Sequence, residues 1–461
     1  MRKNRSPWLH QLQKDRVSKG LVKDIKTDVA IVGAGIAGMA TAFFILKYTP
    51  HTVAVLERFK LAHGATGHNA GQVTSYFERG FASLAEEFGL GPAARGQRAV
   101  EDAWQLLDEI YSDAQMDIPL ARFVGHAGLT SYAQTLLHLR NNEARKRAGL
   151  NTEEICIAKE ALFAREIPPQ YRPYYTLVPH RDILELLETR APEYTTALSY
   201  QKGCINSALL CERLLYYLNQ KYPERFVLYE YTQVEKILLK QGGVLIDAQS
   251  HTVEAARAVL CTNGFESVRI ITQDGLDVDA RFHASLRGGV GYMSGYLENL
   301  NKPPTAISYF PEPAGSAEVN YFYLTRRPYE YEEGTHHNLI SIGGPEVELQ
   351  GGPYSFEQEY PEEMGERIDD FVRRTYDTDP NKKIDYIFTW HGLIGYTKNG
   401  VRMVGPEPKN ARLLYNLGCN GVGILPSIFG GRTVARHVAG ERVEKSIFDV
   451  PSEKSKYPRA L

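Results

Sequence analysis

Residues 28–47 read DVAIVGAGIAGMATAFFILK, and this stretch decides the fold. It opens with the apolar run 29–32, which is typical of a buried parallel strand. Gly33, Gly35 and Gly38 then interrupt the run, and a helical pattern follows. In a G-x-G-x-x-G turn, the first glycine makes the tight turn, the second lets a pyrophosphate approach the backbone, and the third lets the helix pack against the strand. The phosphates then lie at the helix N-terminus, where free N–H groups and the helix dipole favour negative charge.

A second apolar run, 52–56, ends on Glu57 and completes a β-α-β unit. Glu57 follows the last glycine by about 20 residues, the usual distance for a carboxylate that accepts a hydrogen bond from a ribose 2′-OH. A carboxylate at this point repels a 2′-phosphate, so the pattern disfavours NADP. The unit predicts a bound adenine dinucleotide, but by itself it does not separate FAD from NAD.

Length and composition exclude several classes of protein. The chain has 461 residues, which suits two or three domains, and 43% hydrophobic and 23% charged residues indicate a folded globular protein. A net charge of −2, without a long basic run, argues against a nucleic-acid partner. The sequence contains no apolar run long enough to span a bilayer, and because no apolar segment follows the basic first residues, we expect no secretory signal. Five scattered cysteines without a CxxC pair argue against disulfides and a metal site, so we expect a cytoplasmic protein.

The pattern predicts an α/β fold: a Rossmann-type domain assembled from discontinuous segments, with an α+β substrate domain inserted between them. Residues 281–350 are rich in aromatic and β-branched residues with Gly and Pro breaks, which is typical of an antiparallel sheet. Helical periodicity predicts helices at about 93–115, 132–148, 207–220, 361–376 and 428–439. The expected division is an N-terminal arm at 1–26, the cofactor domain at 27–80, 191–265 and 385–461, and the substrate domain at 81–190 and 266–384. Trp8 and Leu9 are expected to pack the arm on the body.

The segment after the second predicted strand carries a family resemblance. Residues 63–72, HGATGHNAGQ, resemble the corresponding segment of the D-amino-acid oxidase superfamily of FAD enzymes, which includes glycine and sarcosine oxidases. In that family the stretch runs from the pyrophosphate toward the flavin ring. The resemblance therefore implies FAD rather than NAD, with backbone N–H groups that reach the N5 and O4 edge of the ring.

Three further segments resemble the same family in the same order, so the resemblance extends over residues 27–440. They are the strand start around Val234, the strand and turn 258–264 (AVLCTNG), and the C-terminal part with 390–400 and 418–423 (GCNGVG). The fingerprint and the resemblance together assign the following residues to FAD: Gly33, Gly35, Ile36, Ala37, Gly38, Glu57, Arg58, Thr66, Gly67, Asn69, Ala70, Gly71, Gln72, Val234, Thr262, Asn263, Gly264, Gly418, Asn420, Gly421 and Gly423.

Two departures from the family pattern matter. The common Thr-Pro-Asp-Gly is replaced by TKNG at 397–400, which brings a cation near the cofactor edge. Gly392 stands where some members carry a cysteine bonded to the flavin, so non-covalent FAD is expected. No second G-x-G-x-x-G follows a strand, which argues against an NAD(P)H site. Oxygen, a quinone or a carrier protein is therefore the expected electron acceptor.

On the substrate side, the resemblance implies that an antiparallel sheet covers the flavin and that an arginine there binds a substrate carboxylate. Residues 320–327, NYFYLTRR, resemble that sheet, so Arg326 or Arg327 is expected to form a bidentate fork. Tyr321 or Tyr323 is expected to line the pocket, and Tyr323 and Arg326 are the primary candidates. The alternative is that these arginines are surface charges at a strand end.

His68 and His391 are two further candidates, as a catalytic base or as structural hydrogen-bonding groups. A base is not required, because hydride transfer from a neutral amine to a flavin depends mainly on orientation and charge placement.

These observations predict an FAD-dependent oxidoreductase that oxidises the C–N bond of an amino acid or secondary amine. Two alternatives remain open at this point. One is a flavin dehydrogenase for a 2-hydroxy acid or polyol, and the other is a non-catalytic flavin-binding subunit of a larger complex.

Overall fold

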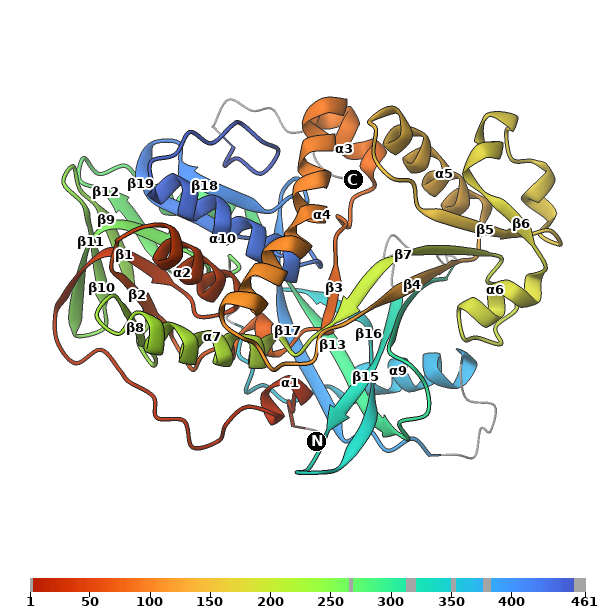
Figure 1. The fold of residues 1–461 in the computed structure, drawn as a ribbon, viewed down its shortest axis with the longest axis horizontal. Coiled ribbons are helices and arrows are strands. Elements are labelled where there is room, and N and C mark those ends of the chain that lie inside the picture. Colours follow the sequence, from red (N-terminus) through yellow and green to blue (C-terminus); the bar gives the residue numbers. More distant parts are fainter. Residues whose placement is uncertain (1–2, 265–267, 312–320, 350–353, 376–382, 452–461) are drawn as a thin grey trace.

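The computed structural model describes residues 3–264, 268–311, 321–349, 354–375 and 383–451. These residues form two large β-sheets that lie side by side, with helices packed around each (Figure 1). The predicted fold class is confirmed: a parallel α/β sheet is combined with an antiparallel sheet assembled from distant segments.

The first sheet contains the predicted β-α-β unit. Its path is β12 (Arg269–Thr272), β9 (Lys236–Leu239), β10 (Val244–Ala248), β11 (His251–Leu260), β1 (Ile25–Val32), β2 (Val53–Leu56) and β8 (Phe226–Tyr229), with β19 (Asn410–Leu417) on β11 and β18 (Met403–Glu407) on β19. Strands β8, β2, β1, β11 and β19 run parallel to one another. Every residue of β2 is buried, as expected for a parallel strand covered on both faces.

Helix α2 (Ile36–Tyr48) connects β1 to β2 and is buried from Ile36 to Leu46. An apolar pattern on all sides of a helix indicates that neighbours cover it on every face. Here α10 (Ile424–Val438) and α7 (Ser207–Lys221) contact it. Gly431 of α10 makes this approach possible, because a Cβ there would lie 2.8 Å from the backbone nitrogen of Thr41.

The second sheet is long and mostly antiparallel. Its path is β17 (Phe388–Thr397), β13 (Leu286–Glu298), β16 (His336–Glu348), β15 (Phe322–Glu330), β14 (Thr305–Phe310), β4 (Ala121–Leu129), β7 (Thr196–Cys204), β5 (Glu154–Ala158) and β6 (Thr176–Val178), with β3 (Gln72–Thr74) on β7. The remaining helices are α1 (Pro7–His10), α3 (Phe81–Phe88), α4 (Leu90–Asp113), α5 (Tyr132–Arg147), α6 (His180–Leu186), α8 (Val278–Ala284) and α9 (Glu362–Thr375), with 3₁₀ turns η1 (Ala65–Gly67), η2 (Leu162–Arg165) and η3 (Pro169–Tyr174).

The division between the two sheets differs from the predicted domain boundaries. Strands β7 and β17, which were expected in the cofactor domain, pair within the second sheet. Strand β12 and helix α8, which were expected in the substrate domain, pack on the first sheet. Apolar periodicity identifies a strand but not its partner, because strand pairing is set by contacts between distant segments.

The N-terminal arm packs on the body as predicted. Trp8 is fully buried, and its ring meets that of Trp390 edge to face with the centroids 6.3 Å apart. The guanidinium carbon of Arg327 lies 4.7 Å from the centre of the Trp8 ring. No helix within the described ranges combines the length and apolar character needed to cross a bilayer.

Candidate active site

One large cavity lies between the two sheets. Its lining includes the glycine turn after β1, most of the segment 64–72, the ends of β2 and β11, and residues of β13, β15 and β17. The predicted cofactor residues that line it are Gly33, Gly35, Ile36, Ala37, Glu57, Arg58, Thr66, Asn69, Ala70, Gly71, Gln72, Val234, Thr262, Asn263, Gly421 and Gly423.

The glycine turn has the geometry that a pyrophosphate requires. Gly33 has φ +103°, and a Cβ on it would lie 2.8 Å from the Cys261 carbonyl oxygen. A Cβ on Gly35 would lie 2.8 Å from Thr66 Oγ1, which accepts a hydrogen bond from the Ile36 N–H at 2.9 Å. Gly35 is the N-cap of α2 and provides no side-chain cap, and Gly35, Ile36 and Ala37 line the cavity, so the N-terminus of the helix borders it.

Glu57 lines the cavity at the end of β2. Its Oε2 accepts a hydrogen bond from the Ala34 N–H at 2.8 Å, and its Oε1 accepts one from the Phe59 N–H at 2.9 Å. These two bonds fix the carboxylate beside the glycine turn. Burial is the main influence on this group and raises its pKa, while the two backbone bonds oppose that effect.

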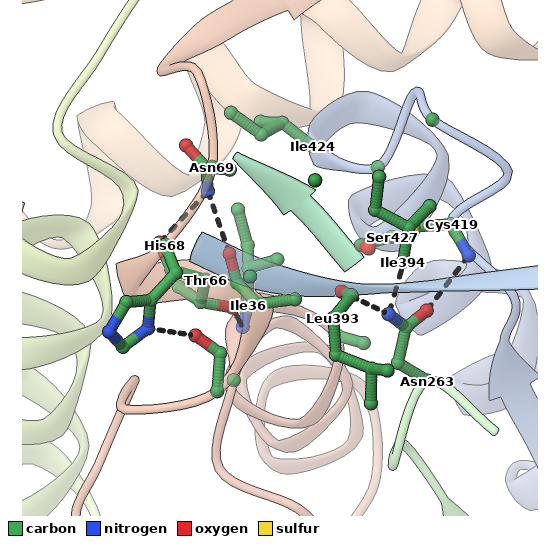
Figure 2. Close-up of a pocket in the computed structure, with 18 of the residues that line it drawn as sticks. Ile36, Thr66, His68, Asn69, Asn263, Leu393, Ile394, Cys419, Ile424 and Ser427 are labelled. Atoms are coloured by element: carbon green, nitrogen blue, oxygen red, sulfur yellow. Dashed lines mark hydrogen bonds between the residues drawn. The ribbon is translucent and has the colours of Figure 1, made fainter. Parts of the chain in front are cut away.

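The segment 63–72 is held by a network centred on Asn69 (Figure 2). Its side-chain amide donates to the Thr66 carbonyl and to Ser207 Oγ, each at 2.8 Å, and its Oδ1 accepts from the Gly71 N–H at 2.7 Å. The Asn69 carbonyl accepts from the indole N–H groups of both Trp8 and Trp390. The N-terminal arm and β17 therefore fix the loop predicted to reach the flavin ring.

Asn263 joins the C-terminal loop to β17, as Figure 2 shows. Its Oδ1 accepts from the Cys419 N–H at 2.9 Å, and its amide donates to the Leu393 carbonyl at 3.4 Å. Its φ of +63° places it in the left-handed region, which asparagine tolerates better than most residues.

Five predicted cofactor residues do not line the cavity: Gly38, Gly67, Gly264, Gly418 and Asn420. A Cβ on Gly38 would lie 1.9 Å from the Gly33 carbonyl, so this glycine sets the helix–strand distance. Asn420 accepts from the Thr397 N–H at 2.8 Å and fixes the loop that follows β19.

Sequence reasoning missed Arg402, which lines the cavity from the start of β18. Its Nε donates to Asn416 Oδ1 at 2.6 Å and its Nη2 to the Asn416 carbonyl at 2.9 Å, while Nη1 has no hydrogen-bond partner within the described residues. The residue is 4% exposed, and burial lowers its pKa to about 10, so it remains charged at neutral pH. A buried, unpaired N–H on a cation fits an anionic group of a dinucleotide.

The far end of the cavity is formed by residues of the second sheet and of the loop after β3. We call this surface the substrate wall; it comprises Tyr76, Glu78, Ser308, Tyr321, Tyr323, Glu346 and Tyr396. Tyr321 or Tyr323 was expected to line the pocket, and both residues do. The two carboxyl groups were not predicted, because Glu78 lies in a loop without a recognisable motif.

Arg326 does not reach this cavity, contrary to expectation. Its Nη1 and Nη2 donate to the two carboxylate oxygens of Glu188 at 2.6 and 2.7 Å, and its Nε donates to the Pro303 carbonyl at 2.8 Å. Arg326 therefore forms the expected bidentate pair, but its partner is Glu188 of the protein itself. This pair lies on the face of the sheet opposite the cavity. Arg327 is also absent from the cavity lining, and its guanidinium packs on Trp8.

Both histidine candidates are held by hydrogen bonds. His68 lines the cavity, and its Nδ1 lies 3.0 Å from the Gly64 carbonyl oxygen. Burial lowers its pKa to about 4, so its ring is neutral. His391 contacts the Gln358 carbonyl through Nε2 at 2.9 Å and the Tyr354 hydroxyl through Nδ1 at 3.0 Å. This arrangement favours the structural interpretation of His391.

The sequence profile of the family described as FAD dependent oxidoreductase, DAO, matches residues 28–437. This chain belongs to that family. It is an FAD-dependent oxidoreductase, and the glycine turn, Glu57 and the unpaired N–H of Arg402 form a suitable site for the cofactor.

Solved structures with the same fold cover nearly the whole chain. Glycine oxidase from Geobacillus kaustophilus is 17% identical with a TM-score of 0.64, and the match covers 93% of this chain and 100% of that one. L-proline dehydrogenase from P. horikoshii is 14% identical with a TM-score of 0.64, covering 91% and 95%. FAD-bound L-alpha-glycerophosphate oxidase from Mycoplasma pneumoniae is 14% identical with a TM-score of 0.60, covering 93% and 99%. A search of curated protein sequences finds no match.

Replacement of Glu57 by alanine is expected to weaken FAD binding by about 1–3 kcal/mol, the scale for losing a hydrogen bond to a charged group. Affinity is expected to fall because the variant lacks the carboxylate that the Ala34 and Phe59 N–H groups hold in position for the ribose. Titration of apoprotein with FAD measures the effect. Unchanged affinity would show that the ribose does not bind at Glu57.

Replacement of Arg402 by methionine is expected to weaken FAD binding by about 10- to 100-fold, the range for a charge-assisted hydrogen bond. The same titration measures it. Arg412→Met is a suitable control, because Arg412 is a partly buried residue of β19 that does not line the cavity, and its Nη2 donates to the Gln241 carbonyl. An equal effect of both substitutions would remove Arg402 from the cofactor site.

Proposed function

We propose that this enzyme oxidises the C–N bond of a small amine or amino acid. The observation that carries the proposal is one continuous cavity, which extends from the dinucleotide-binding turn to a wall of tyrosines and carboxyl groups. Bound FAD supplies a flavin ring that accepts a hydride from the carbon next to nitrogen. The residues of the chain then have to orient that carbon and hold a proton of the amine.

Several features support an amine over a hydroxy acid or polyol. The substrate wall presents hydroxyl and carboxyl groups, which accept hydrogen bonds from an amine, and neither Arg326 nor Arg327 contributes a fork for a carboxylate. Glycine oxidase and L-proline dehydrogenase share the fold, but so does the glycerophosphate oxidase. The fold alone therefore does not decide the substrate.

An anaerobic donor screen of the purified holoenzyme tests the proposal. Primary and secondary amines and amino acids are expected to bleach the oxidised flavin band, whereas 2-hydroxy acids and polyols are not. Bleaching by a hydroxy acid or polyol alone would support the first alternative. A flavin that no donor reduces, in a protein that co-purifies tightly with another chain, would support a non-catalytic subunit.

We also infer that FAD is held without a covalent bond. Gly392 offers no nucleophile, and a Cβ there would lie 2.4 Å from the His68 carbonyl, so the position has no room for a longer side chain. Acid denaturation is expected to release FAD into the supernatant. Flavin that stays with the precipitated chain would contradict this inference.

A further inference from the structure

The charges of the substrate wall are all negative. Glu78 and Glu346 are its ionisable acids, and it contains no lysine, arginine or histidine. Segments 312–320 and 350–353, which flank its strands in the sequence, also contain no lysine, arginine or histidine. A carboxylate of a substrate would therefore meet like charges there, whereas an ammonium group would meet opposite ones.

Glu78 is the better placed of the two acids. Its side chain lines the cavity, and its Oε1 accepts a hydrogen bond from the Tyr321 hydroxyl at 3.1 Å. Glu346 accepts from the Tyr396 hydroxyl at 2.8 Å. Each carboxylate keeps an oxygen that these tyrosines do not occupy, so each can accept a further N–H.

The tyrosines add a second kind of cation recognition. The rings of Tyr321 and Tyr323 have centroids 5.6 Å apart, and Phe310 stacks on Tyr321 at 4.7 Å. Tyr76, Tyr321 and Tyr323 all line the cavity. Burial raises the pKa of each, so their rings stay neutral. The negative faces of such rings attract an ammonium group, most strongly where water is excluded.

The nearest cations lie behind the wall. Lys202 does not line the cavity and is fully buried, with Nζ 3.3 Å from Ser308 Oγ and 3.4 Å from Gln72 Oε1. Arg287 packs over the outer side of Tyr396, with 4.6 Å from its guanidinium carbon to the ring centre, and contacts Glu348. Neither residue lines the cavity, so neither is placed to pair with a carboxylate bound there.

We propose that the substrate wall binds the ammonium group of an amine that carries no carboxylate next to the reacting nitrogen, and that Glu78 accepts the proton that this ammonium must lose. The inference rests on the proposed oxidation of a C–N bond. One N–H bond of the ammonium breaks, its proton moves to the Glu78 carboxylate, and the electron pair stays on nitrogen. The neutral amine then donates a hydride from the adjacent carbon to FAD, and water hydrolyses the resulting iminium to a carbonyl compound and an amine.

The surroundings of Glu78 suit this role. Burial raises its pKa to about 7, while the Tyr321 hydrogen bond and the Lys202 charge lower it, and Glu346 raises it. The charge of Glu78 in turn raises the pKa values of Tyr76 and Tyr200, which lie near it. Cation binding is therefore expected to strengthen between pH 6 and pH 8, as Glu78 ionises.

The first test measures binding with a probe that the enzyme cannot oxidise. Tetramethylammonium has no nitrogen lone pair, and its binding to the holoenzyme at pH 8 is followed by the flavin difference spectrum, with propionate as the anionic comparison. Glu78→Gln is expected to raise the Kd for tetramethylammonium at least tenfold, with FAD content unchanged. Glu348→Gln removes a charge from the same strand as Glu346 but outside the cavity, and it serves as the control.

The second test compares donors of one skeleton with and without the carboxylate: pyrrolidine with proline, and dimethylamine with sarcosine. The amines are expected to reduce the flavin with at least tenfold higher kcat/KM. Faster reduction by the amino acids, tighter binding of propionate, or equal effects of Glu78→Gln and Glu348→Gln would overturn the inference. If no amine or amino acid reduces the flavin although tetramethylammonium binding depends on Glu78, the recognition site stands and the proposed oxidation fails.

Discussion

Replacement of Gly35 by valine is expected to give a folded protein that retains almost no FAD. A Cβ at this position would lie 2.8 Å from Thr66 Oγ1, the atom that accepts the Ile36 N–H. The two γ-methyl groups of valine would extend into the space where the pyrophosphate approaches the start of α2. The substitution therefore removes room for the phosphates and disturbs the hydrogen bond that fixes the first turn of the helix.

The measurement is the FAD-to-protein ratio after purification, together with the circular dichroism spectrum. Gly242→Val is the matched control, because Gly242 lies in the turn between β9 and β10 and a Cβ there would meet no atom within 4 Å. The control is expected to keep its full FAD content. A Gly35→Val protein with bound FAD would place the dinucleotide away from the glycine turn.

The features predicted most reliably from sequence are those set by local chemistry. The glycine turn and Glu57 belong to one β-α-β unit, and their spacing follows from how a phosphate must meet a helix N-terminus. Helices with clear apolar periodicity were also found close to their true bounds; α7, expected at 207–220, spans Ser207–Lys221. Each of these signals is contained in a short, continuous stretch of the sequence.

The error at Arg326 has a reason that the sequence itself contains. Side chains alternate between the two faces of a strand, so Tyr323 and Arg326, three residues apart on β15, must point to opposite faces. With Tyr323 facing the cavity, Arg326 faces Glu188 instead. Arg327 shares the face of Tyr323 but lies further along the strand, where the N-terminal arm covers it.

The substrate wall could not be assembled from sequence, because distant segments meet there. Glu78 follows β3, which pairs with β7, while Tyr321 precedes β15 and Tyr396 lies on β17. A lone glutamate in a loop gives no local signal of a partner almost 250 residues away. Arg402 gives no local signal either, because its interest depends on Asn416, which occupies Nε and Nη2 and leaves Nη1 without a partner within the described residues.

Lys202 gives the prediction with the largest effect on stability. Its ammonium is fully buried and contacts only neutral oxygens among its hydrogen-bond partners, those of Gln72 and Ser308. Burial lowers its pKa from 10.5 to about 7, and Glu78 only partly opposes that effect. This burial costs free energy at every pH below about 10, where the unfolded lysine keeps its proton, and the full cost applies below about pH 7.

Lys202→Met is therefore expected to stabilise the protein most at pH 7 and below, by about 4 kcal/mol from the pKa difference. Between pH 7 and about pH 10 the unfolded wild type binds more protons than the folded one, so wild-type stability rises with pH, and the advantage of the mutant shrinks. Urea unfolding of both FAD-saturated proteins at several pH values measures the difference. Lys26→Met, at an exposed lysine of β1, is the control and should show no such slope. A mutant that is less stable at every pH would mean that the hydrogen bonds of Lys202 outweigh its desolvation. The expected result would instead show that the chain keeps a destabilising lysine beside Glu78, where its charge lowers the pKa of the group that we propose receives the substrate proton.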